Sequence, residues 1–389
     1  DSEPVTATVE ILDGAIGEFV APGDTYLKFG KSVSLDEHGT RLAVGSTSGP
    51  GGPGNVNIYE RSATTWGAPQ SLSIPEIEHV TRVLLSADGE VLVVAAFEEN
   101  KVFVYHWSDT AWMLADNGPL GAEVEHQDGF GGSVDLSADG RTIVVGVPNE
   151  SFVYTFTRSG SSWEEESAIE GASPDSKFGA QVAIDGAGDI VVVGAPNAGA
   201  TGVVNVYERQ TTPQVWVPSQ ILPEPSDGVA TGARFGSLLA LSSDGTRLVV
   251  AADDAGVAGV HIYSWSDALA QEQHLEGIAG IVENGDFWGG LSLNADGTVL
   301  AIGASKDDSD AAGLGGEVGS GLEQSGAVHV FARQGGQAQS IWTPRAFVKA
   351  AKSNAGDWFG SSVALSDDGE SLAVGAEASL GYIGAVYLY

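Results

Sequence analysis

Three aspartates within four residues form the densest group of potential metal ligands in this chain. Asp307, Asp308 and Asp310 lie in a glycine-rich segment, 305–325, which also contains Glu317. Carboxylate oxygens are the ligands that Ca²⁺ prefers, and each ion takes about six to eight oxygens. We therefore predict a metal site at these four acidic residues, with Ca²⁺ as the expected cofactor. The alternative is a solvated acidic loop that holds no ion.

Two further pairs of residues are candidates for contact with a ligand. Trp288 and Trp358 are extra tryptophans beside repeated aromatic positions, and an exposed indole ring can stack on a sugar. Asp253 and Asp254 form a shorter acidic pair. We predict that these four residues bind ligand. Packing between strands and solvated acidic turns are the alternatives.

The chain offers little for catalysis. Its seven histidines are scattered, none in the H-x-x-x-H spacing of a metal site, and no G-x-S-x-G nucleophile motif occurs. Among 52 acidic residues, no carboxylate pair for glycoside hydrolysis can be singled out. No catalytic residue is assigned, and the sequence favours a protein that is not an enzyme.

The candidate residues are carried by a unit that occurs seven times. Each copy opens with a ring-bearing residue and has a glycine ten positions later. The opening residues are Phe29, His79, Phe130, Phe178, Phe235, Phe287 and Phe359, and the glycines are Gly39, Gly89, Gly140, Gly188, Gly245, Gly297 and Gly369. A period of about 50 residues is typical of a repeat array or a propeller.

Each unit except the last contains four short strand patterns. The first alternates polar and apolar residues, as at 133–136. The second is almost wholly apolar, as at 143–145, and ends in Gly or Ala, which lets a neighbouring backbone come close. Between them, pairs such as Asp88-Gly89 predict a type I′ hairpin turn. Four antiparallel strands repeated seven times predict an all-β, seven-bladed β-propeller.

We expect one propeller domain across residues 1–389. The predicted blades cover 27–76, 77–125, 128–172, 176–224, 233–279, 285–350 and 357–389. The last unit ends at Tyr389 without a fourth strand of its own. We therefore expect a strand at 5–11 to complete that blade and close the ring, which would remove an exposed sheet edge.

The charge of the chain excludes several classes of partner. There are 52 Asp and Glu residues against 17 Lys and Arg, giving a formal net charge of −35. Such a surface repels phosphate backbones, so nucleic acid is not an expected partner. No apolar run reaches the roughly 18 residues that a membrane-spanning helix needs, so membrane insertion is not expected either.

The repeat resembles the FG-GAP repeat. Phe178-Gly179 opens one unit, and Gly194-Ala195-Pro196 is a literal Gly-Ala-Pro. The whole chain is similar to the seven-bladed propellers of integrin alpha subunits, and more so to FG-GAP proteins of bacterial and algal cell surfaces. Integrins carry a calcium-binding D-x-D-x-D-G loop between the first two strands. Here Ser137-Ala138-Asp139-Gly140 keeps one carboxylate, so calcium is not carried over to these turns.

The resemblance implies a secreted or cell-surface module for binding or adhesion. Loops on one propeller face would recognise a protein or a glycan, with divalent cations assisting. The chain would act as a monomer or as part of a larger surface protein. Two alternatives stay open: a propeller enzyme, lyase or hydrolase, acting on polysaccharide, and a purely structural block of a larger surface protein.

Overall fold

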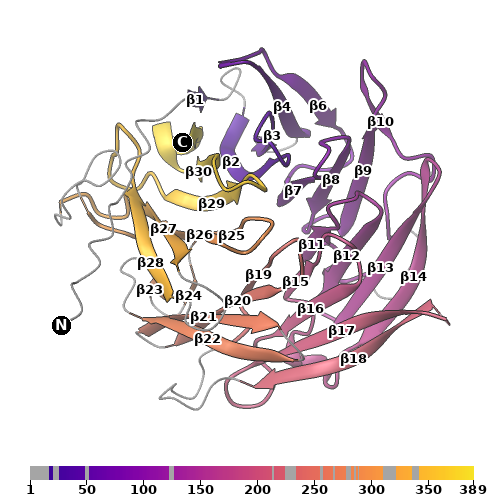
Figure 1. Cartoon of the computed structure of the whole chain (residues 1–389). Helices are drawn as coiled ribbons and strands as arrows, with labels where there is room; N and C mark the ends of the chain where they lie inside the picture. The colour runs from indigo at the N-terminus through magenta and orange to yellow at the C-terminus, as the bar shows by residue number, and fades with distance from the viewer. Residues whose placement is uncertain are drawn as a thin grey trace, which may run out of the picture.

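Seven antiparallel sheets stand in a ring, with the first strand of each nearest the axis (Figure 1). The computed structural model describes residues 17–20, 26–48, 52–121, 127–212, 214–223, 234–254, 257–265, 268–276, 282–283, 286–287, 289–309, 321–334 and 341–389. The predicted all-β, seven-bladed propeller is confirmed. Among the described residues, no helix is long and apolar enough to cross a membrane.

The first four blades follow one another along the chain. Blade 1 contains β2 (Tyr26–Leu35), β3 (Arg41–Ser48), β4 (Gly54–Ser62) and an outer strand in two pieces, β5 (Thr65–Trp66) and β6 (Gln70–Ile74). Blade 2 contains β7 (Arg82–Leu85), β8 (Val91–Ala96), β9 (Lys101–Trp107) and β10 (Trp112–Leu114). Blade 3 contains β11 (Ser133–Leu136), β12 (Thr142–Val147), β13 (Phe152–Ser159) and β14 (Ser162–Glu170). Blade 4 contains β15 (Gln181–Ile184), β16 (Ile190–Ala195), β17 (Val203–Thr211) and β18 (Gln214–Pro223).

The remaining blades complete the ring. Blade 5 contains β19 (Leu238–Leu241), β20 (Arg247–Asp254), β21 (Val257–Trp265) and β22 (Leu269–Glu276). A short pair, β23 (Val282–Glu283) and β24 (Asp286–Phe287), leads to blade 6 with β25 (Leu291–Leu293), β26 (Val299–Ala304), β27 (Ala327–Gln334) and β28 (Ile341–Val348). Blade 7 contains β29 (Phe359–Leu365), β30 (Leu372–Ala376), the helical turn α1 (Ser379–Tyr382), β31 (Ala385–Leu388) and β1 (Gly17–Val20).

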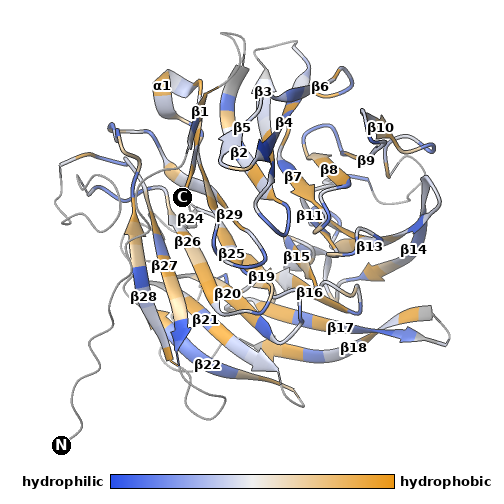
Figure 2. Cartoon of the chain, turned by 45° about the horizontal axis from the view of Figure 1, so that its top comes forward, coloured by the Kyte–Doolittle hydropathy of each residue, from blue (hydrophilic) through white to orange (hydrophobic). Residues whose placement is uncertain are grey.

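The core lies between neighbouring blades. The second strands are hydrophobic along their length (Figure 2), and Ile143, Val144 and Val145 are fully buried although their side chains alternate between two faces. Both faces are covered because each blade packs against one neighbour on either side. For example, one apolar cluster joins Val93 of β8 to Val145 of β12. The prediction of strands buried on both faces is confirmed.

Small residues at the ends of the second strands let adjacent blades meet. A Cβ atom added at these positions would come closer than 3.0 Å to a glycine carbonyl oxygen of the next blade. The pairs are Gly146 with Gly179, Gly194 with Gly236, Gly303 with Gly360, and Gly375 with Gly30. The second glycine of each pair is the one that follows the opening residue of the repeat. The close backbone approach expected from the sequence is therefore present.

The turns between the first two strands differ from the predicted type I′ form, so that prediction is wrong. In blade 2, Gly89 has φ of 69° while Asp88 has no positive φ, and Gly89 N–H donates to Ser86 O at 2.8 Å. This is a type I turn followed by a left-handed glycine. Asp88 Oδ1 accepts from Ser86 Oγ at 2.5 Å and from Glu90 N–H at 2.9 Å. The Asp88 carboxylate therefore stabilises the turn by itself, and the turn does not need the several aspartates of a calcium-binding loop.

The N-terminal segment supplies the outer strand of blade 7, as expected. That strand is β1, which pairs antiparallel with β31 from Gly17↔Leu388 to Val20↔Ala385. The predicted position at 5–11 was wrong, and those residues lie outside the described part of the chain. Phe19 accounts for the true position, because its ring packs at 4.6 Å from Tyr59 and anchors β1 over the junction of blades 7 and 1.

We expect the protein to lose stability in alkali because of its buried tyrosines. Burial raises the pKa of Tyr387 to about 12, with the charge of Glu18 adding to the effect. Burial, with the charge of Glu76, does the same for Tyr105, also to about 12. The unfolded phenol has a pKa of about 10, so the stability present below that pH is lost as the pH rises toward about 12. At about pH 11 each tyrosine should cost roughly 1 kcal/mol.

Urea unfolding at about pH 9 and about pH 11 measures this loss. Tyr105→Phe and Tyr387→Phe remove the titrating hydroxyls, so each variant should lose less stability between the two pH values than the wild type. An equal loss in the wild type and in both variants would show that other groups cause the alkaline transition.

Candidate functional site

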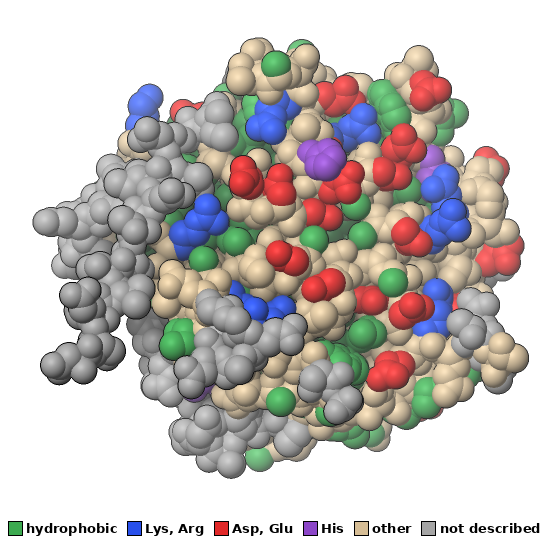
Figure 3. All heavy atoms as spheres, in the orientation of Figure 1, with side chains coloured by type: hydrophobic (Ala, Val, Ile, Leu, Met, Phe, Trp, Pro, Cys, Tyr) green, Lys and Arg blue, Asp and Glu red, His purple; other side chains and the backbone are tan. Residues whose placement is uncertain are grey.

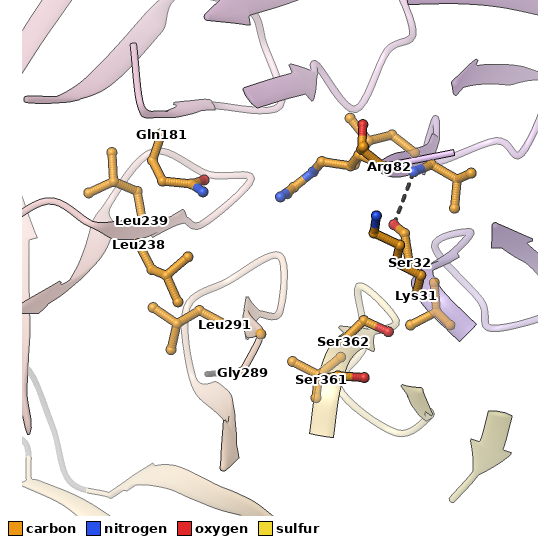
Figure 4. A pocket seen from close by; sticks show the side chains of 16 residues that line it. Lys31, Ser32, Arg82, Gln181, Leu238, Leu239, Gly289, Leu291, Ser361 and Ser362 are labelled. Atoms are coloured by element: carbon orange, nitrogen blue, oxygen red, sulfur yellow. Dashed lines mark hydrogen bonds between the residues drawn. The ribbon is translucent and has the colours of Figure 1, made fainter. Parts of the chain in front are cut away.

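A cavity of about 160 Å³ lies where the inner strands of six blades begin (Figure 4). Residues at or beside the starts of β7, β15, β19 and β25 line it, together with Lys31–Val33 of β2 and Ser361–Val363 of β29. The cavity therefore lies on the propeller axis, toward the face that also carries the loops between second and third strands. The 305–325 segment, which contains the predicted metal residues, begins at this face.

The cavity has a polar side and an apolar side. Leu238, Leu239 and Leu291 lie on one side, while Lys31 and Arg82 lie on the other, near serine hydroxyls (Figure 4). Equivalent positions of the inner strands line the cavity, but the residue type at these positions differs from blade to blade. The cavity therefore has two chemically different sides. Such a cavity suits a group that has both a charged and an apolar part.

Arg82 is half-buried and lies beside a carboxyl group of the next blade. Its Nε–H is buried and finds no acceptor among the described residues. On the far side it lies near Asp135 of β11. Burial raises the pKa of the Asp135 carboxyl, and the Arg82 guanidinium opposes that rise. Asp135 also accepts the Ile184 N–H at 2.8 Å, so its carboxylate is shared with blade 4. Arg82 therefore keeps donor capacity toward the cavity.

Lys31 is held on the same side of the cavity by hydrogen bonds between blades 1 and 2. Ser32 Oγ accepts the Val83 N–H at 3.0 Å, and Ser34 Oγ accepts the Leu85 N–H at 2.9 Å. These bonds fix β2 against β7. Lys31 itself is half-buried and has no hydrogen bond or ion pair to another residue of the described chain. Two cations thus face one small cavity.

The surface around this site is strongly acidic. Figure 3 shows Asp and Glu side chains spread over the described part of the visible face, in keeping with the net charge of −35. Long-range repulsion therefore disfavours polyanions, while the two cations in the cavity favour a single anionic group at short range.

The predicted metal residues do not converge in the described structure. Asp307 is buried, and its Oδ1 lies 3.3 Å from the ammonium of Lys349, which is also buried. Asp308 is exposed, and its Oδ1 accepts the Gln324 N–H at 2.8 Å. Asp310 and Glu317 lie outside the described residues. An internal cation thus pairs with the carboxylate that was assigned to Ca²⁺, and calcium binding by the 305–325 segment stays a prediction.

Trp358 is partly engaged by its own neighbours. The ammonium of Lys306 lies 4.2 Å from the ring centroid, and Tyr382 meets the ring edge-on at 6.0 Å. The indole Nε1–H donates to Gln324 Oε1 at 3.2 Å. This half-buried ring belongs to a cluster that joins blades 6 and 7. Its role in binding ligand stays a prediction.

The other predicted ligand residues cannot be placed by their side chains. Asp253 and Asp254 end β20, in register with Ala258 and Val257 of β21, and only their backbone is described. Trp288 lies outside the described residues. Lys31 and Arg82 were not among the residues predicted from the sequence. The signal for Arg82 was its position, since Ser32 and Ser133 stand at the same point of neighbouring repeats.

The geometry defines a seven-bladed β-propeller with a cavity on its axis. The protein-family model described as the FG-GAP repeat matches residues 342–389, which contain nearly all of β28 and the blade 7 elements β29, β30, α1 and β31, but not β1. The chain is therefore a seven-bladed propeller of the FG-GAP type. A search of curated protein sequences found no match.

Several solved structures share the fold at low sequence identity. Hydrazine synthase from Kuenenia stuttgartiensis has a TM-score of 0.57 at 14% identity, covering 91% of this chain and 94% of that one. A protein from Bacteroides uniformis, provisionally assigned as a 6-phosphogluconolactonase, has a TM-score of 0.58 at 12% identity, covering 83% and 86%. A protein from Lactobacillus plantarum has a TM-score of 0.56 at 13% identity, covering 84% and 86%.

These structures correct the expectation that the chain is not an enzyme. Propellers of this shape include a hydrazine synthase and proteins provisionally assigned as lactonases, so an all-β propeller gives no ground for excluding catalysis. At this level of identity the likeness concerns the fold alone, and no activity is transferred from these proteins to this chain.

Proposed function

We propose that this propeller is a secreted or cell-surface binding module that takes a carboxylate group of its ligand into the axial cavity. The observation that carries the proposal is the pairing of Lys31 and Arg82 on one side of a cavity of about 160 Å³. FG-GAP repeats are typical of extracellular proteins, which supports the location. The ligand class expected from the sequence, a protein or a glycan, is retained.

The size and polarity of the cavity narrow the ligand. A cavity of about 150 Å³ accepts a molecule the size of benzene, so this one takes a single small group rather than a chain. Arg82 has a planar guanidinium that matches a carboxylate, and Leu238 and Leu291 offer apolar contact beside it. The acidic surface disfavours polyanionic ligands. We infer a ligand with an isolated carboxylate, such as a carboxylated sugar.

Arg82→Gln is expected to weaken binding of a carboxylated sugar by about tenfold to a hundredfold. A hydrogen bond to a charged group contributes roughly 1.5 to 3 kcal/mol, which corresponds to that range. The probe is glucuronate, compared with glucose, and binding is measured by isothermal titration calorimetry or by ligand-observed NMR. Wild-type protein should bind glucuronate more tightly than glucose. Lys31→Gln should also weaken the binding of glucuronate, so that its affinity approaches that of glucose.

The matched control is Lys352→Gln, which removes the same charge from an exposed position away from the cavity. It should leave the preference for glucuronate unchanged. The proposal fails if wild-type protein binds both sugars equally, or if Lys352→Gln weakens binding as much as Arg82→Gln does.

A further inference from the structure

Blade 2 brings one histidine and two glutamates together at the same end of the propeller. His79 precedes β7, and Glu98 and Glu99 follow β8. Each residue offers one ligand atom, and these atoms lie within 4.8 Å of one another. The pairing of β7 with β8, with Arg82 opposite Ala95, brings residues 20 positions apart to one edge. A single ion could contact all three side chains.

Glu99 is held in place by the backbone, and one of its oxygens is left over. Its Oε1 accepts the Glu78 N–H at 2.8 Å and the His79 N–H at 3.3 Å, and lies 3.3 Å from His79 Nδ1. Its Oε2 is buried and has no hydrogen-bond partner among the described residues. A buried carboxylate oxygen without a partner costs free energy, and a bound cation would remove that cost.

Comparison with blade 3 separates the structural role of this glutamate from the rest of the group. Glu150 is the equivalent residue there, and its Oε1 accepts the Asp128 N–H at 2.8 Å. The repeat therefore uses one carboxylate oxygen to hold the turn before the inner strand. Blade 3 places the fully buried Phe130 where blade 2 has His79. That structural role explains one oxygen of Glu99, but not the imidazole, Glu98 or the second oxygen.

We propose that His79, Glu98 and Glu99 bind a divalent transition-metal ion, with Zn²⁺ as the best match. An imidazole nitrogen with carboxylate oxygens suits Zn²⁺, whereas Ca²⁺ prefers oxygen ligands alone. Three protein ligands leave a coordination position for water or for a further ligand. The proposal does not depend on the cavity, although β7 carries both Arg82 and this group.

The test is a calorimetric titration of the purified protein with Zn²⁺ at about 1 M NaCl. At that ionic strength the Debye length is about 3 Å, so diffuse attraction of cations to the acidic surface is suppressed. The wild type should bind about one Zn²⁺ per chain. His79→Ala should weaken binding at least tenfold. Glu98→Gln alters an exposed residue, so it should keep the fold while also weakening binding.

His38→Ala is the matched control. His38 Nε2 lies 3.3 Å from Glu37, as His79 lies from Glu99, but His38 is in no three-ligand group of the described chain. It should bind Zn²⁺ like the wild type. The assignment is overturned if wild-type protein binds no Zn²⁺ under these conditions, if the His79 and Glu98 variants bind as the wild type does, or if equimolar Ca²⁺ displaces the Zn²⁺.

Discussion

Replacing Lys349 with methionine is expected to destabilise the protein by about 3 to 5 kcal/mol, the usual result of removing one partner of a buried ion pair. The Lys349 ammonium is fully buried and donates to Ser309 O at 2.5 Å and to Ser325 Oγ at 2.7 Å. It also lies 3.3 Å from Asp307 Oδ1. Methionine fills a similar volume, so the loss would come from leaving the buried Asp307 carboxylate without its counter-charge.

A double variant distinguishes lost charge pairing from lost packing. Asp307→Asn combined with Lys349→Met removes both charges, so it should recover a large part of the stability that Lys349→Met loses. Urea unfolding measures both variants against Lys352→Met, an exposed control expected to change stability by less than about 0.5 kcal/mol. If Lys349→Met is as stable as that control, the buried pair is not a structural element of blade 6.

This pair also shows what the run of carboxylates in the sequence does not reveal. The carboxylates at 307–310 are visible as a run of letters, whereas Lys349 lies about 40 residues further on. The two meet because β28 returns beside β27 to the end of the blade at which the segment begins. A count of carboxylates in the 305–325 segment therefore overlooks Lys349, which only the pairing of the strands brings next to Asp307.

The fold was predictable because it depends on a pattern repeated seven times. Each copy carries an apolar second strand and a left-handed glycine in the turn. A wrong interpretation of one copy therefore does not change the predicted fold. Local details were less predictable. The type I turn at Ser86 depends on hydrogen bonds of Asp88 that the Asp-Gly pair alone does not reveal. The position of β1 depends on the packing of Phe19 across a junction between blades.

The candidate sites depend on departures from the repeat rather than on its pattern. His79 replaces a phenylalanine, and Arg82 stands where three other repeats have serine. Each departure is visible in the aligned units, yet its meaning needs the structure. Only there does His79 meet Glu98 and Glu99, and only there does Arg82 face the same cavity as Lys31. A search for metal ligands that are close in sequence does not find residues 20 positions apart, such as His79 and Glu99, which the β7–β8 hairpin brings together.

Gly375→Ala is expected to destabilise the protein by about 3 kcal/mol, at the upper end of the usual cost of overpacking. Its Cβ would come closer than 3.0 Å to the backbone carbonyl oxygen of Gly30 and to Ser362 Oγ. Gly375 has no positive φ, so the cost is steric and not conformational. Ser362 Oγ donates to Gly30 O at 2.8 Å, and a shift of blade 7 would break this bond at the closure of the ring.

Unfolding in guanidinium chloride measures the effect, with Gly67→Ala as the control. A Cβ at Gly67 would meet its nearest atom, Glu60 O, at an ordinary 3.5 Å, so that variant should stay close to the wild type. Equal midpoints for the two variants would show that adjacent blades can separate without cost. Gly303→Ala makes the same clash with Gly360 between blades 6 and 7. A larger loss at Gly375 than at Gly303 would mean that the junction closed by β1 contributes more to stability than a junction between consecutive blades.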